Sequence, residues 1–218
     1  MRLRQAGRLP KWQEQGAPVL RDVRQDDISQ DLASITRPIY LEVGCGKGGF
    51  IAQMAARHKD AFFIGVDKVS IVIAKAAAKA IEHELDNVLF INGDIEEIAA
   101  KLSGKQVERI FLNFSDPWPR RRNHIRRLTA PQKLECYETL LAPGGVIEQK
   151  TDNSELFEWS VTAFQAAGWQ LMRVERGFAP GEPDDGSISS QFVQTEYEQK
   201  FRAQGIPINY LRAAAPQR

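Results

Sequence analysis

Apolar and polar positions between residues 38 and 201 alternate in a pattern that predicts strands and helices in turn. Short apolar runs rich in Val, Ile and Phe predict strands, and apolar residues spaced three or four apart predict helices. The predicted strands are 39–43, 61–66, 88–92, 109–114, 146–149, 169–176 and 192–201. The predicted helices are 48–57, 70–84, 95–101, 129–141 and 154–167. This order predicts an α/β fold with a mostly parallel seven-stranded sheet and helices on both faces.

The chain outside this pattern is polar and rich in turn residues. We expect residues 1–36 to form a basic, partly flexible N-terminal extension, because prolines interrupt them, and residues 37–218 to form one domain. Residues 177–191 predict a long flexible loop. Thr129 and Gln132 predict a capping box at the start of a helix. Alanines at 74–80 predict a packing surface on another helix.

Composition narrows the protein class. Hydrophobic residues make up 43% of the 218 residues, which is ordinary for a globular protein. No apolar run reaches the roughly 18 residues needed to span a bilayer, and the N-terminus lacks a secretory signal, so we expect a cytoplasmic protein without a membrane segment. Cys45 and Cys136 form no metal-binding motif, so we expect no metal. The oligomeric state, monomer or homodimer, stays open.

Positive charge gathers in two places although the net charge is only +1. The first segment, near the N-terminus, contains Arg2, Arg4, Arg8 and Lys11 and no acid. The second segment is residues 120–127, with arginines at positions 120, 121, 122, 126 and 127. Five arginines in eight positions repel one another without an anionic partner, so we expect nucleic-acid phosphates to be that partner.

A glycine-rich turn follows the first strand of the predicted sheet. Glycines let a backbone turn tightly and approach a ligand closely. Gly44, Gly46 and Gly49 also satisfy the spacing of a dinucleotide-binding turn. A nicotinamide-dependent oxidoreductase is therefore one alternative.

Acidic residues recur at the carboxyl ends of the predicted strands, where ligands of such sheets bind. Glu42 lies in the first strand, and the next four strands are followed by Asp67, Asp94, Asp116 and Asp152. Asp67 has the position to accept hydrogen bonds from ribose hydroxyls, and Asp94 from the amine of an adenine. Carboxylates that lie together at one edge of the sheet repel one another unless a cationic ligand binds between them. S-adenosylmethionine carries an ammonium and a sulfonium, whereas a dinucleotide carries a diphosphate, so the charges favour methyl transfer.

The order of these motifs resembles a known family. Glu42-Val43-Gly44-Cys45-Gly46-Lys47-Gly48, Asp67 and Asn92-Gly93-Asp94 are similar to the general class I methyltransferase pattern. Asn113-Phe114-Ser115-Asp116-Pro117-Trp118-Pro119, the arginine run, Lys150-Thr151-Asp152 and Thr195-Glu196-Tyr197-Glu198 resemble the bacterial tRNA (guanine-N7-)-methyltransferases of the TrmB type. The resemblance extends from about residue 36 to residue 202. Ser115, where many members have proline, and Cys45 are departures that remove no functional group.

The resemblance implies a Rossmann-like class I fold, S-adenosylmethionine as cofactor, and methylation of guanine 46 in the variable loop of tRNA. It implies cofactor-binding roles for six positions: Glu42, Gly44, Gly46, Asp67, Asp94 and Asp116. Asp116 also matches the catalytic position. It implies substrate-binding roles for Arg120, Asp152, Thr195 and Glu198.

Two further residue interpretations bear on substrate binding. Trp118 has either a base-stacking role or a role in the core, and Phe111 and Phe114 are expected in the core. Besides the oxidoreductase, two alternatives stay open: a methyltransferase for another nucleic-acid or small-molecule acceptor, and an RNA-binding module without activity. The intact acids at 42, 67, 94 and 116 speak against the last of these.

Overall fold

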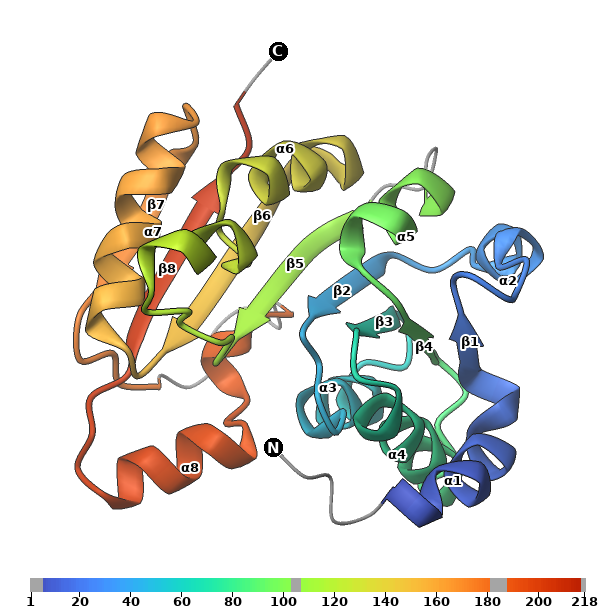
Figure 1. The fold of residues 1–218 in the computed structure, drawn as a ribbon. Coiled ribbons are helices and arrows are strands. Elements are labelled where there is room, and N and C mark those ends of the chain that lie inside the picture. Colours follow the sequence, from blue (N-terminus) through green and yellow to red (C-terminus); the bar gives the residue numbers. More distant parts are fainter. Residues whose placement is uncertain (1–5, 103–106, 181–187, 217–218) are drawn as a thin grey trace. The chain divides into compact units, whose positions relative to one another are not determined.

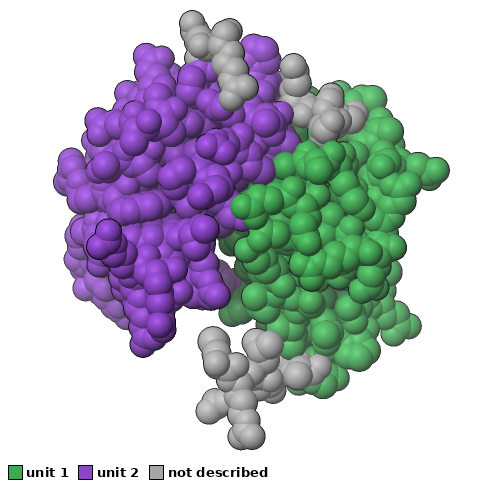
Figure 2. All heavy atoms as spheres, turned by 45° about the horizontal axis from the view of Figure 1, so that its top comes forward, with its two compact units in different colours: residues 1–105 green, residues 106–218 purple. Residues whose placement is uncertain are grey.

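The computed structural model describes residues 6–102, 107–180 and 188–216 of the chain. The chain forms two compact units, residues 1–105 and residues 106–218, which Figure 2 shows in different colours. Arg2 and Arg4 of the basic N-terminus lie outside the described residues. Within the described ranges, every helix is too short or too polar to cross a membrane.

The first unit contains a four-stranded parallel sheet (Figure 1). Its strands are β1 (Leu20–Asp22), β2 (Ile39–Val43), β3 (Phe62–Asp67) and β4 (Val88–Asn92), in the order β1-β4-β3-β2. Its helices are α1 (Leu9–Gly16), α2 (Ser29–Ser34), α3 (Gly49–Arg57), α4 (Ser70–Glu82) and α5 (Ile95–Leu102). The predicted strand–helix alternation is confirmed here, because the buried apolar strands β2, β3 and β4 are each followed by an amphipathic helix.

The second unit combines parallel and antiparallel pairing. Its strands are β5 (Val107–Asn113), β6 (Leu141–Thr151), β7 (Gln170–Glu175) and β8 (Asn209–Ala214). Its helices are α6 (Pro131–Leu140), α7 (Ser154–Ala166) and α8 (Glu196–Ala203), with 3-10 turns at Arg121–Arg126 and Ser190–Phe192. β5 pairs with β6 in parallel, and β8 runs antiparallel between β6 and β7.

Residues 6–36 contain α1, β1 and α2, which the sequence pattern did not predict. β1 adds an edge strand beside β4 and brings the described strands to eight, one more than predicted. α1 packs on α4 (Figure 1), and a Cβ built on Gly16 would come within 2.6 Å of the Ala77 Cβ. Lys75 lies over the Trp12 ring, 5.3 Å from its centroid. The alanine-rich packing surface predicted at 74–80 is thereby confirmed.

Two local predictions in the second unit are wrong. Residues 192–201, expected as the last strand, contain α8, and the last strand is β8, which the sequence pattern missed. The Thr195 hydroxyl accepts a hydrogen bond from the Glu198 N–H at 3.0 Å and caps α8. The capping box predicted at Thr129 is absent from α6, because the Thr129 hydroxyl is bonded to the Ser160 hydroxyl at 2.8 Å instead.

Candidate cofactor and substrate sites

The glycine loop, residues 44–48, connects β2 to α3 in the first unit. The φ values of the loop glycines are 78° at Gly44, 55° at Gly46 and 69° at Gly48, and residues with a Cβ rarely adopt such values. A Cβ at Gly48 would lie 2.7 Å from the Ala76 Cβ, so this glycine is also needed for packing. A Cβ at Gly46 would meet nothing within 4 Å, so the space beside this residue is open. The loop therefore has room for a ligand against its backbone at Gly46.

Asp67 fixes the shape of the glycine loop. Its carboxylate oxygens accept the Gly46 N–H at 2.9 Å and the Val69 N–H at 2.8 Å. Glu42 is 3% exposed and lies close to the same loop. Burial raises the pKa of the Cys45 thiol well above its ordinary value, and the charges of Glu42 and Asp67 raise it further. The loop thus lies in a negative potential, which suits a cationic ligand better than a diphosphate.

Asp94 follows β4 and forms an ion pair with the partly exposed Lys68. A cavity of about 230 Å³ lies beside this pair, with Ser70 and Asn92 also in its wall. Asn92 donates to the Asp67 carbonyl at 2.9 Å and accepts from the Ser70 hydroxyl at 2.9 Å. The predicted cofactor acids of the first unit therefore lie at the carboxyl ends of adjacent strands, as strand-end positions should.

The Asp116 loop, residues 114–119, follows β5 in the second unit. Phe114 and Trp118 both have positive φ values, 51° and 41°, which are costly for bulky residues. Asp116 between them is exposed and forms no hydrogen bond or ion pair with any other residue that the structure describes. Strained backbone around a free carboxylate is typical of a functional loop.

A buried arginine holds this loop in place. Arg127 is 0% exposed, and its guanidinium donates to the Pro117 carbonyl at 2.8 Å and to Glu155 at 3.0 Å. It also lies 4.8 Å from the centroid of the Trp159 ring. The prediction that the whole arginine run faces phosphates is therefore wrong at Arg127, whose charge is used inside the protein.

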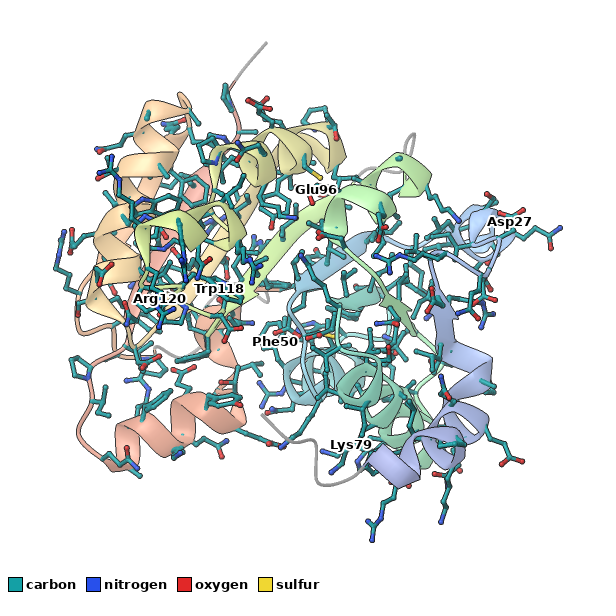
Figure 3. All side chains as sticks on the ribbon, viewed as in Figure 1. Asp27, Phe50, Lys79, Glu96, Trp118 and Arg120 are labelled. Carbon is teal, nitrogen blue, oxygen red and sulfur yellow. The ribbon has the colours of Figure 1, made fainter. Side chains whose placement is uncertain are left out.

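The remaining arginines of the run are exposed: Arg120, Arg121, Arg122 and Arg126. Arg126 lies over the Trp118 ring, 4.9 Å from its centroid, so Trp118 is partly covered rather than free. Trp118 and Arg120 are labelled in Figure 3, on the segment between β5 and the 3-10 turn. The Arg120 guanidinium has no hydrogen-bond or ion-pair partner among the described residues, whereas the Arg120 carbonyl accepts the Asn123 N–H at 2.7 Å. The exposed arginines present a cationic surface.

Asp152 follows β6 and is half-buried. It forms no hydrogen bond or ion pair within the described parts of the chain, and Asn153 beside it caps α7 by accepting the Leu156 N–H at 2.7 Å. Asp152 and Asp116 thus share one property: each is a strand-end carboxylate whose oxygens are not used by the fold.

Thr195 and Glu198, in contrast, are buried. Glu198 is 0% exposed and accepts the Lys150 ammonium at 2.5 Å and the Arg202 guanidinium at 2.7 Å. Lys150 also donates to the carbonyls of Ser190 and Val193 at 2.8 and 2.9 Å. Burial lowers the pKa of Lys150, and Glu198 opposes that shift. This network, which sequence reasoning missed, fastens α8 and the segment before it to β6.

Comparisons with known proteins assign the chain to a family. A family model described as a putative methyltransferase matches residues 36–211. The chain is 36% identical over 192 residues to a tRNA (guanine-N(7)-)-methyltransferase of Macrococcus caseolyticus, covering 88% of this chain and 89% of the relative. It is 41% identical over 176 residues to the enzyme of the same name from Lactococcus lactis, covering 81% and 79%.

Solved structures show the same fold at low identity. The 16S rRNA methyltransferase KamB aligns with a TM-score of 0.63 at 16% identity, covering 88% of this chain and 94% of that one. An antibiotic-related methyltransferase aligns with a TM-score of 0.61 at 16% identity, covering 87% and 92%. The Rossmann-like class I fold is confirmed, and the oxidoreductase alternative is excluded. The chain belongs to the family of S-adenosylmethionine-dependent tRNA (guanine-N7-)-methyltransferases.

Proposed function

We propose that this enzyme transfers the methyl group of S-adenosylmethionine to N7 of guanine 46 in the variable loop of cytoplasmic tRNA. The observation that carries this proposal is the free Asp116 carboxylate on a strained loop. The relatives' names support the guanine-N7 chemistry, and the exposed arginines support an RNA substrate.

The residues of the first unit fit the cofactor. The open space at Gly46 and the negative potential of Glu42 and Asp67 suit a ligand that carries an ammonium and a sulfonium. We assign Glu42, Gly44, Gly46 and Asp67 to holding it, with Asp94 at its adenine end. Asp116 of the second unit keeps the cofactor-binding role that its match to the family pattern implies. When bound, the cofactor supplies an electrophilic methyl group.

Asp116 acts by positioning and by charge rather than as a base. Guanine N7 carries a lone pair and no proton, so the reaction requires alignment of the base rather than proton removal. The Asp116 carboxylate accepts hydrogen bonds from N1–H and N2–H₂ of guanine, and it favours the positive charge that develops on the purine. Asp152 supplies the second carboxylate contact to the base.

The other substrate residues act on the RNA backbone and on the shape of the site. Arg120 and its exposed neighbours bind phosphates near the target nucleotide. Because Thr195 and Glu198 are buried, we assign them an indirect role: they hold α8, and substrate contacts come from the exposed residues of that helix.

The test is methylation of an unmodified tRNA transcript, followed by location of N7-methylguanosine. Methyl incorporation at guanine 46, and none in a transcript carrying adenine there, is the expected result. Asp116→Asn should slow single-turnover methylation by roughly 30- to 900-fold, the equivalent of about 2–4 kcal/mol in the transition state. Glu135→Gln, at an exposed acid of α6, is the matched control. Methylation at another nucleotide or on a small molecule would assign a different acceptor.

A further inference from the structure

We propose that Tyr197, backed by Phe114 and Phe201, is the surface on which the extruded guanine stacks, and this proposal rests on the proposed function. The three rings form one cluster. Phe114 lies 6.5 Å from Tyr197 and 6.0 Å from Phe201, and Tyr197 lies 6.3 Å from Phe201, centroid to centroid. The planes of each pair differ by 22° to 29°, so the rings are close to parallel.

Tyr197 is the exposed member of this cluster. It is 60% exposed, whereas Phe114 and Phe201 are half-buried. Of the large apolar side chains that the described residues leave exposed, Tyr197 is the aromatic one, and the others are Val69, Ile125 and Met172. An aromatic ring held by two others and open to solvent is the arrangement that proteins use to stack an unpaired base.

The chain connects this cluster to both free carboxylates. Phe114 lies two residues before Asp116 at the end of β5. The Phe114 N–H donates to the Lys150 carbonyl at 2.8 Å, and Lys150 lies two residues before Asp152. Phe114 of the aromatic cluster and the two carboxylates therefore come from the same pair of strand ends. Together they offer a purine what it needs, a flat apolar surface for its ring and acceptors for its N–H groups.

The cluster is also rigid, which a stacking surface requires. Tyr197 lies in the first turn of α8, where the Thr195 cap and the buried Lys150–Glu198 ion pair fix the helix. Arg202 holds Glu198 from the next turn of the same helix. Because these contacts exist without RNA, the base meets a preformed surface, and binding orders few protein groups.

The experiment compares substitutions of Tyr197 by shape. Tyr197→Phe keeps the ring, Tyr197→Leu keeps an apolar side chain without a ring, and Tyr197→Ala removes both. Met172→Ala, at an exposed apolar position on β7, is the control. Steady-state methylation of the tRNA transcript gives KM and kcat, and titration of each protein with S-adenosylmethionine checks that cofactor binding is intact.

We expect the Ala and Leu variants to lose about 5- to 100-fold in kcat/KM for tRNA, with unchanged cofactor binding and thermal midpoints. The Phe variant and Met172→Ala should stay within about twofold of wild type. Equal activity of Tyr197→Leu and wild type would overturn the stacking role, as would wild-type kinetics in Tyr197→Ala. If wild type itself does not methylate tRNA, the proposed function fails, and the stacking surface fails with it.

Discussion

Replacing Arg127 with methionine should uncouple the Asp116 loop from the rest of the second unit. Methionine keeps an unbranched apolar stem, but without the guanidinium it no longer bonds the Pro117 carbonyl, reaches Glu155 or lies as a cation over the Trp159 ring. A charge-assisted hydrogen bond contributes about 1.5–3 kcal/mol, and a desolvated cation–π contact about 2 kcal/mol. The Glu155 side chain is 66% exposed, so its ion pair adds at most about 1 kcal/mol.

The gain from no longer burying a charge offsets part of this cost, which leaves an expected destabilisation of about 2–4 kcal/mol. Urea denaturation followed by circular dichroism measures it. Arg126→Met is the matched control for stability: its exposed guanidinium lies over Trp118, and its removal should cost about 0.5–1 kcal/mol.

The rate of tRNA methylation provides a second measurement on Arg127→Met. A displacement of about 1 Å in a reacting group lowers a rate by roughly 100-fold. Under conditions where Arg127→Met is folded, kcat should therefore fall by about 10- to 100-fold. A denaturation midpoint equal to that of wild type, or an unchanged kcat, would refute the role assigned to Arg127.

Three further outcomes follow from the geometry. Gly48→Ala should destabilise the protein by about 2–4 kcal/mol, through backbone strain and overlap of the new Cβ with Ala76, and urea denaturation measures this loss. Gly46→Ala should cost only about 1–2 kcal/mol of stability but should weaken cofactor binding, which calorimetric titration measures. Folding raises the pKa of the Cys45 thiol, so this group's contribution to stability is present below the pKa of an unfolded thiol and is lost as pH rises above that value. At about pH 8.5, iodoacetamide should therefore label Cys136 before the buried Cys45. Equal labelling rates of the two cysteines would contradict this. Arg122→Ala should reduce the slope of tRNA affinity against salt concentration in a filter-binding assay, and an unchanged slope would remove this arginine from the interface.

Much of the first unit was predictable because its strands and helices are specified locally. Apolar strands ending in glycine or aspartate mark the βα turns, and the bounds of β2 and β4 agree with the prediction. The same rule located Asp67, which the structure places on the Gly46 N–H.

The missed features depend on interactions between residues distant in sequence. Residues 192–201 were predicted as a strand, but the Thr195 cap and the Lys150–Glu198 ion pair favour a helix there. β8 is a strand because it pairs with β6 and β7, and a six-residue run carries little signal of its own. The burial of Arg127 likewise depends on Trp159 and Glu155, which no local pattern reveals.

The folding of α1 and β1 onto the first unit has a consequence for where the protein can be cut. The match to the family model begins at residue 36, yet the polypeptide that completes this unit starts at least as early as Leu9. A protein shortened to the matched range would lack β1 and α1. The outer edge of β4 would then be unpaired, and the alanine-rich face of α4 would be exposed to solvent. Such an edge invites pairing between molecules, so the shortened enzyme should aggregate even though every proposed catalytic residue is retained.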